Sequence, residues 1–186
     1  MLKVYFILSL AGIIFLGCST SKPIKTTIEI NAPAEKVFLY LGNSNHAQEW
    51  SIFVHHITPL NSDTIPDGQI GSKRRCFKKA NENGLQWDET ITEIIYGQKR
   101  ELVCYNYRRF FLTVPNLATE QIYVNTDSTS SLLSFTCFMK NYQPRAWQAF
   151  KFELARPIVR YVFRRNLRNI KKIIENQEYY FTIEEN

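Results

Sequence analysis

The order of its predicted secondary structure elements constrains the fold of this chain more than any other feature. A β-branched, alternating segment at residues 26–31 comes first, and two short helical segments follow it before residue 51. Six further strand-like segments then lead into one long helical pattern over residues 145–179, interrupted at Pro157. An antiparallel meander of this kind buries one face, and the long helix is the element available to cover it. The sequence therefore predicts an α+β fold.

Turn-forming sequences separate the six later strands. Pro66-Asp67-Gly68 and Asn83-Gly84 carry residues that favour turns and tolerate left-handed backbone. With 186 residues, the chain has room for one domain with a sizeable core and too little for two. The expected strands cover residues 52–58, 70–79, 85–95, 100–109, 119–125 and 131–141.

The first 17 residues have the pattern of a targeting signal rather than of a folded element. Residues 4–16 form a 13-residue apolar run, which is too short to span a bilayer comfortably and fits the core of a signal peptide. The run ends at Gly17-Cys18, which resembles a lipobox, where the cysteine thiol takes a diacylglycerol group. We expect a signal peptide at residues 1–17, a lipid-modified Cys18, a tether over 18–25, a folded domain over 26–180 and a tail over 181–186.

This interpretation places the mature protein in the cell envelope. The lipid would hold it on a membrane, and in a Gram-negative host on the periplasmic face of the outer membrane, because Ser19 rather than an aspartate follows Cys18. A plain secretory signal and an uncleaved membrane anchor are the alternatives.

Four segments, taken in order, resemble pieces of the START/polyketide-cyclase (SRPBCC) superfamily, which has the helix-grip fold. The ending from Leu167 to Glu175 is similar to the last helix of that superfamily. The resemblance spans nearly all of the chain after Cys18. The four segments are Ile28 to Phe38, Asn45 with Glu49-Trp50-Ser51, Pro66 to Ser72, and Trp87 to Thr92.

The resemblance implies a seven-stranded curved antiparallel sheet that grips a long C-terminal helix, with two short helices after the first strand. It also implies an internal cavity for a hydrophobic or amphipathic ligand in a START-like domain. The superfamily includes carriers, receptors and cyclases, so the fold alone does not define an activity. Our leading hypothesis is a membrane-tethered, non-enzymatic binding or carrier protein for a hydrophobic small molecule or lipid. The alternatives are a cyclase/dehydrase-like enzyme that uses Glu89, and a structural envelope protein whose own side chains fill the cavity.

Alternation along residues 85–95 places a carboxylate on an otherwise apolar strand face, which Trp87, Glu89 and Ile91 share. A carboxylate on such a face has to be paired or neutralised, and the preceding strand offers Arg74 or Arg75, depending on register. Glu89 therefore either orients a ligand or forms half of a structural ion pair. The candidate cavity residues are Trp50, Arg74, Arg75, Trp87, Glu89 and Ile91.

The C-terminal helical segment carries a dense positive charge. Between Lys140 and Ile174, ten Lys or Arg residues stand against one acid, Glu153. Like charges four residues apart weaken a helix slightly, so their spacing does not serve helix stability. We expect this basic ridge either to contact anionic lipid headgroups or an acidic partner, or to be a solvated face. The ridge consists of Arg156, Arg160, Arg164, Arg168 and Lys172.

Cysteine and histidine usage argues against a metal site. Cys76, Cys104 and Cys137 lie in strands that are not neighbours in the meander of the superfamily, so we expect three free, buried thiols. His55 and His56 are adjacent, and in a strand they point to opposite faces and cannot share a metal ion. No P-loop, dinucleotide or serine-elbow motif is present, and we expect no cofactor.

Two features bear on partners. The basic residues after residues 68–71 lead into a strand, whereas a nucleic-acid GxxG loop joins two helices, so we expect no nucleic acid partner. The long helix brings Trp147, Phe150 and Phe152, which we expect to roof the cavity over an apolar ligand. The expected partners are therefore a hydrophobic or lipid-like ligand and a membrane, while the oligomeric state stays open.

Overall fold

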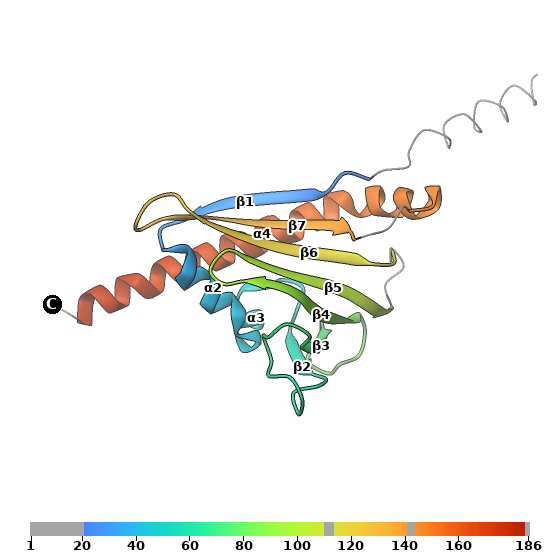
Figure 1. The fold of residues 1–186 in the computed structure, drawn as a ribbon, viewed down its shortest axis with the longest axis horizontal. Helices are drawn as coiled ribbons and strands as arrows, with labels where there is room; N and C mark the ends of the chain where they lie inside the picture. The colour runs from blue at the N-terminus through green and yellow to red at the C-terminus, as the bar shows by residue number, and fades with distance from the viewer. Residues whose placement is uncertain (1–20, 110–113, 141–143, 185–186) are drawn as a thin grey trace, which may run out of the picture.

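The computed structural model describes residues 21–109, 114–140 and 144–184, and the side chains of the last helix as far as residue 176. Its seven strands form one antiparallel sheet in the order β1-β7-β6-β5-β4-β3-β2, which curves around the long helix α4 (Figure 1). The predicted α+β class, seven strands and short helical segments after the first strand are confirmed. The elements are β1 (Ile24–Ile30), α2 (Ala34–Gly42), the 3-10 helix η1 (Ser44–His46), α3 (Ala47–Trp50), β2 (His56–Pro59), β3 (Lys73–Phe77), β4 (Gln86–Ile95), β5 (Lys99–Arg108), β6 (Leu117–Asn125), β7 (Ser131–Met139) and α4 (Ala146–Glu184).

The sheet is a meander completed by its first strand. From β2 to β7 each strand pairs with the next one along the chain, whereas β1 returns to pair with β7 over its whole length. Short turns make this possible: Gly97, at φ 69°, takes the left-handed position between β4 and β5, and Thr126 N–H donates to Ser130 O at 2.9 Å between β6 and β7. The order places β3, β5 and β7 two strands apart.

Helix α2 covers one end of the inner face of the sheet. Its N-cap residue, Pro33, has no side chain that can accept a hydrogen bond. Ala34 N–H donates instead to Oδ1 of Asn125, at the end of β6, at 2.7 Å. A residue distant in sequence therefore caps the helix and fixes it on the sheet. Its buried side chains include the predicted apolar face, Val37, Phe38 and Leu41.

Helix α4 runs through Pro157 without the expected interruption. Proline lacks the N–H that bonds four residues back, but Pro157 lies on the exposed side of the helix. Buried side chains lie on both sides of it, with Phe152 before and Leu167, Ile170 and Ile174 after. Because most helix stability in proteins comes from such packing, the lost hydrogen bond does not end the helix.

The second strand is shorter than predicted, beginning at His56 instead of covering residues 52–58. Ser51 Oγ accepts hydrogen bonds from the N–H groups of Phe53 and Val54, at 3.1 and 3.0 Å, and holds the chain in a turn after α3. Such side-chain bonds to the backbone compete with strand pairing. The later strands match their predicted bounds to within three residues at each end.

Two of the predicted domain boundaries lie inside secondary structure elements. Strand β1 already includes the last two residues of the tether expected over 18–25, and α4 includes the start of the tail expected over 181–186. The signal peptide expected at residues 1–17, Cys18 and residues 185–186 lie outside the described residues. Among the described residues, no helix combines the length and apolar character needed to cross a membrane.

The space between the sheet and α4 has two unlike halves. Beside α2 a continuous core fills it, and the rings of Phe38 and Tyr123 meet edge to face there at 5.3 Å between centroids. Towards α3, β2 and β3 the side chains leave a cavity. We call these the closed half and the open half. The closed half consists of Ile30, Val37, Phe38, Tyr123, Leu133, Ile170 and Ile174, and the open half of Cys76, Trp87, Cys104, Cys137, Val162 and Phe163.

Candidate functional site

The open half contains a cavity of about 210 Å³. It lies between the inner face of strands β3 to β7, the segment from α3 to β2, and the N-terminal half of α4. Its wall is mostly apolar and aromatic, as is typical of sites for hydrophobic ligands. The wall includes Trp50, Phe53, Ile57, Leu102, Phe135, Ile158, Val162 and Phe163.

The volume of the cavity limits the size of a guest. Sites for drug-sized ligands usually measure about 300–1,000 Å³. An apolar cavity of about 150 Å³ is enough for benzene. At about 210 Å³, this cavity suits a compound of one or two rings, or part of an acyl chain, rather than a polycyclic molecule.

A polar cluster interrupts the apolar wall. Arg74 on β3 lies beside Glu89 on β4 in the sheet register, and its Nε donates to Glu89 Oε2 at 3.0 Å. Trp87, on the same strand face, donates its indole N–H to Oε1 of this carboxylate at 2.8 Å. The side chains of Arg74 and Glu89 are only 11% and 13% exposed. Glu89 therefore does face inward in an ion pair, and Arg74 rather than Arg75 is its partner.

Charge pairing holds this polar cluster in place. Burial alone would lower the pKa of Arg74, but the Glu89 carboxylate raises it above its ordinary value. Each Glu89 oxygen accepts a hydrogen bond from the protein, so the carboxylate is fixed in one orientation. Oε1 also accepts a weak hydrogen bond from the Cys104 thiol at 3.9 Å, so the second lone pair of Oε2 is the one that can orient a hydroxyl or amine of an apolar guest.

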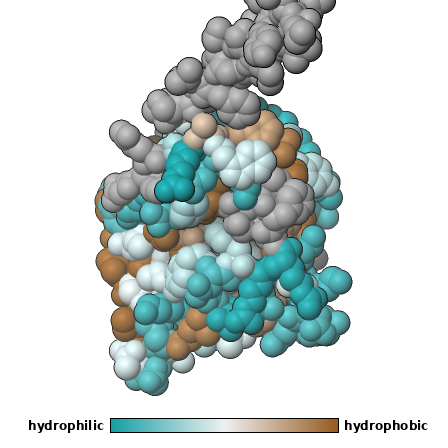
Figure 2. All heavy atoms as spheres, turned by 90° about the vertical axis from the view of Figure 1, so that its right-hand side faces the viewer, coloured by the Kyte–Doolittle hydropathy of each residue, from teal (hydrophilic) through white to brown (hydrophobic). Residues whose placement is uncertain are grey.

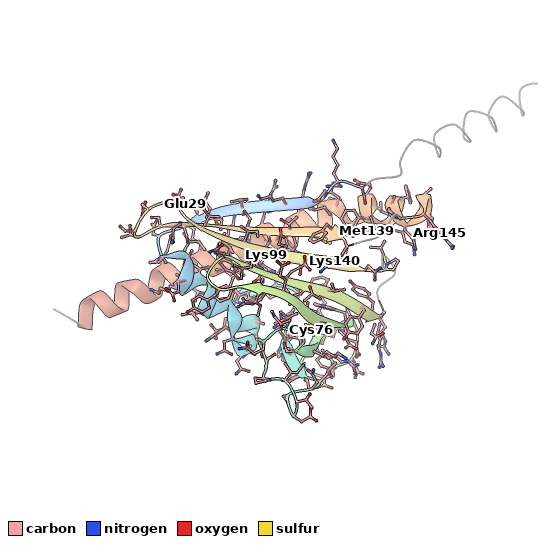
Figure 3. The ribbon with its side chains drawn as sticks, in the orientation of Figure 1. Glu29, Cys76, Lys99, Met139, Lys140 and Arg145 are labelled. Atoms are coloured by element: carbon pink, nitrogen blue, oxygen red, sulfur yellow. The ribbon has the colours of Figure 1, made fainter. Side chains whose placement is uncertain are left out.

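Three thiols, from β3, β5 and β7, line the cavity, and all three are free and buried, as predicted. Figure 3 marks the first of them, Cys76. Burial raises the pKa of Cys137 to about 12, and burial together with the nearby Glu89 carboxylate raises the pKa values of Cys76 and Cys104 well above the ordinary range. The thiols stay protonated at neutral pH, so they are poor nucleophiles.

Two of the predicted cavity residues do not line the cavity. Arg75 points to the outer face of β3, where its Nε and Nη2 donate to the two carboxylate oxygens of Asp88 at 2.7 and 3.0 Å. Ile91 is on the inner face, but it lies beside Leu102 at 1% exposure and is packed away from the cavity. The other four candidates do line it: Trp50, Arg74, Trp87 and Glu89.

The prediction that three aromatic residues of the long helix roof the cavity is wrong, because none of the three is among the residues that line it. Trp147 and Phe150 are 59% and 49% exposed, and their rings stack on each other at 5.4 Å between centroids. Phe152 is buried. The helix phase explains the difference, because at about 100° per residue Phe152 lies far around the axis from the other two.

The basic ridge is not one straight face of α4. Residues four apart advance by about 40° around a helix, so five of them wind through about 160°. Arg156, at one end, turns inward to pair with Glu153 at 2.5 Å, and its Nη2 also donates to Lys22 O at 2.7 Å. It is therefore a structural contact. The other four ridge residues are exposed: Arg160, Arg164, Arg168 and Lys172.

A buried cation in the closed half was missed by the sequence reasoning. Arg100 on β5 is 3% exposed, and its guanidinium lies over the ring of Phe38 at 4.4 Å. Its Nη1 donates to Gln121 Oε1 at 3.3 Å and to Tyr123 Oη at 3.2 Å. These described partners are neutral, and burial lowers the pKa of Arg100. The alternation that turns Leu102 inward also turns Arg100 inward, so a signal for it was present in the sequence.

The histidines do not line the cavity. His46 Nδ1 lies 2.8 Å from Glu49 Oε1, His56 Nε2 lies 3.2 Å from Glu82 Oε1, and His55 is exposed. Within the described part of the chain, no group of three or more His, Cys, Asp or Glu side chains is placed to hold a metal ion.

Comparison with solved structures confirms the predicted helix-grip α+β fold. Norcoclaurine synthase from Thalictrum flavum, in complex with dopamine and hydroxybenzaldehyde, has a TM-score of 0.58 at 14% identity, over 89% of this chain and 92% of that one. An aromatase/cyclase from a Streptomyces species has a TM-score of 0.59 at 16% identity, over 84% of this chain and 94% of that one. XoxI from Bacillus cereus has a TM-score of 0.63 at 14% identity, over 84% of this chain and 97% of that one. No protein-family model matches the sequence, and no curated protein matches it.

Proposed function

We propose that this protein binds or carries a small hydrophobic molecule in its open half, while a lipid on Cys18 tethers it to a membrane of the cell envelope. The observation that carries the proposal is the apolar cavity of about 210 Å³ with the Arg74–Glu89–Trp87 cluster on its wall. An apolar site with a few placed polar groups is the usual form of a small-molecule site.

The ligand we propose is a compound of one or two rings with one hydrogen-bonding group, or one end of an acyl chain. The volume of the cavity supports this size. Dopamine and hydroxybenzaldehyde, the ligands in the norcoclaurine synthase structure, are one-ring molecules with polar groups. A guest of that kind fits the volume of this cavity, although the shared fold by itself does not select a ligand.

Binding is favoured over catalysis by the state of the reactive groups. Burial raises the pKa values of the three thiols, which disfavours the nucleophilic thiolate, and both oxygens of Glu89 already accept hydrogen bonds from Arg74 and Trp87. A general base would first have to release one of these bonds. A cyclase/dehydrase-like activity through Glu89 is therefore the second candidate. A purely structural role is third, because only the closed half is filled by its own side chains.

The tether is supported by the sequence before the folded domain. The apolar run of residues 4–16 and Gly17-Cys18 precede β1 by only a few residues. Metabolic labelling with palmitate tests it: the wild-type chain should take the label and Cys18→Ala should not. Label in the variant would exclude the anchor and leave cavity binding untouched.

Binding in the cavity is tested with a naphthalene fluorophore, which has two rings. It should bind at one site and quench emission from Trp50 and Trp87, which line the cavity. Val162→Trp puts bulk into the cavity from α4 and should remove binding. Val103→Trp, on β5 and not among the cavity residues, is the matched control and should bind as the wild type does. Unchanged binding to Val162→Trp would refute the cavity as the site.

The role of Glu89 is tested by comparing naphthol with naphthalene. If the carboxylate orients a ligand hydroxyl, Glu89→Gln should weaken naphthol binding by about tenfold while naphthalene binding changes little, since hydrogen bonds to charged groups contribute about 1.5–3 kcal/mol. An equal change for both ligands would assign Glu89 to structure alone.

A further inference from the structure

The outward face of the N-terminal half of α4 is apolar, and no described element covers it. Five large side chains on this face are between 47% and 59% exposed. They recur at spacings of three and four residues, so they form one stripe about 21 Å long on the helix. Such a patch on a soluble domain marks a contact surface. The stripe consists of Trp147, Phe150, Leu154, Ile158 and Tyr161.

The same helix face becomes basic beyond the stripe. Arg165, Arg168 and Lys172 continue its spacing after Tyr161, and all three are exposed. Among the α4 side chains that the structure describes, two are acidic, Glu153 and Glu175. Each of them forms an ion pair with a basic neighbour. The outward face of α4 is therefore apolar along one half and positive along the other.

The chain enters the domain at the same end of α4 as this stripe, but on the other side of the helix, because Arg156 lies about 160° around the axis from Leu154. The bond from Arg156 Nη2 to Lys22 O fixes the segment before β1 against the N-terminal half of α4. The start of β1 and the first turns of α4, near the labelled Arg145, lie at the same end of the molecule (Figures 1 and 3). Figure 2 faces this end, and below the grey atoms it shows apolar side chains among polar ones. The proposed lipid site, Cys18, lies four residues before Lys22 in the sequence.

We propose that this face of α4 lies on an anionic membrane surface, with the apolar stripe at the boundary of headgroups and acyl chains and the basic residues on lipid phosphates. The proposal rests on the proposed tethered binder. Trp and Tyr favour the membrane interface, and a helix with an apolar face beside Lys and Arg is the form that lies in it. Positive charge on the same face, for which the described residues supply no acidic partner, selects an anionic surface.

This orientation places one rim of the cavity on the membrane. Ile158 belongs to the exposed stripe and also lines the cavity, and Val162, one turn later, lines it too. An apolar guest can then pass between the bilayer and the open half without crossing water, where exposure of its apolar surface is unfavourable. The apolar stripe and the cavity thus serve the same ligand.

The test uses the full chain in vesicles of phosphatidylcholine with phosphatidylglycerol, some of which carry brominated acyl chains. Trp147 is one of three tryptophans, so the emission of Trp147→Phe subtracted from that of the wild type gives the signal of Trp147 alone. We expect brominated lipid to quench this signal. Leu154→Glu should remove the quenching. Leu39→Glu on α2 is the matched control, because Leu39 and Leu154 are 54% and 52% exposed, and it should leave the quenching unchanged.

The outcomes separate this proposal from the proposed function. A chain that does not float with the vesicles at all refutes both the anchor and the docked face. A chain that floats while its Trp147 stays unquenched refutes the docked face alone. Dimers that form through the stripe and protect Trp147 without lipid would assign the face to a second copy of this chain. Naphthalene binding, measured in the same samples, reports on the cavity independently.

Discussion

The closed and open halves of the interior lie between the same sheet and the same helix, yet one is filled and the other is hollow. In the closed half, bulky inward residues such as Phe38, Tyr123 and Leu133 meet without a gap. In the open half, Cys76, Cys104 and Cys137 occupy inward positions on β3, β5 and β7. A cysteine side chain is much smaller than a phenylalanine or tyrosine ring. The cavity therefore arises because small residues occupy three inward positions of the sheet.

The two halves also treat buried charge differently. In the open half, Arg74 is paired with Glu89 at the cavity wall. In the closed half, Arg100 bonds to neutral groups and to the face of Phe38. An ion pair at a cavity wall leaves lone pairs that a guest can use, whereas Arg100 ties α2 to the sheet. Three predictions test this contrast.

The largest expected effect is on the packing of the closed half. Phe38→Ala should lower the free energy of unfolding by about 3–5 kcal/mol, because a fully buried ring is lost and the surrounding side chains cannot close the gap. Phe53→Ala, on the wall of the cavity, should cost about 1 kcal/mol, because Phe53 is only partly buried. Urea unfolding followed by circular dichroism measures both. Equal losses would mean that the two halves are packed alike.

The next effect concerns the two inward arginines. Arg74→Met should destabilise the fold by about 3 kcal/mol, since it leaves the Glu89 carboxylate buried without its cation. Arg100→Met should cost about 1 kcal/mol, because its described partners, Gln121 and Tyr123, are neutral and bond to each other. The same urea titrations measure the loss of stability in both variants. A larger loss for Arg100→Met would show that this cation has a charged partner as important as Glu89.

The sequence was enough to predict what depends on local periodicity. Alternation placed Trp87 and Glu89 on the inner face. The prediction of free thiols came instead from the strand order that the family resemblance implied, which puts the three cysteines two strands apart. The choice between Arg74 and Arg75 needed the register of β3 on β4, which a shift of one residue reverses. Alternation alone does not contain that information.

Tertiary packing determines the side-chain directions and the cavity volume, which the sequence pattern does not predict. The outward direction of Trp147 and Phe150 depends on how α4 is rotated against the sheet, which an aromatic-rich segment does not specify. Ile91 faces inward as predicted, but whether an inward residue reaches a cavity depends on the size of its neighbours. The volume of about 210 Å³ is a sum over many such side chains, so periodicity does not predict it.

The smallest effect comes from adding volume instead of removing it. Cys137→Leu extends a cavity residue into empty space and should change the free energy of unfolding by less than about 1 kcal/mol. Val37→Leu, at 0% exposure in the closed half, adds less volume but has no space to enter, and should cost about 1–3 kcal/mol.

Ligand binding turns this pair of variants into a test of the cavity itself. The leucine in Cys137→Leu occupies part of the volume that the guest needs, so naphthalene binding should weaken although stability is kept. Val37→Leu should bind naphthalene normally at temperatures where it stays folded, because the closed half does not contact the guest. If Cys137→Leu is as destabilised as Val37→Leu, the space in the open half is not free in solution. In that case the small cysteines are there for close packing, and the contrast between the two halves does not explain binding.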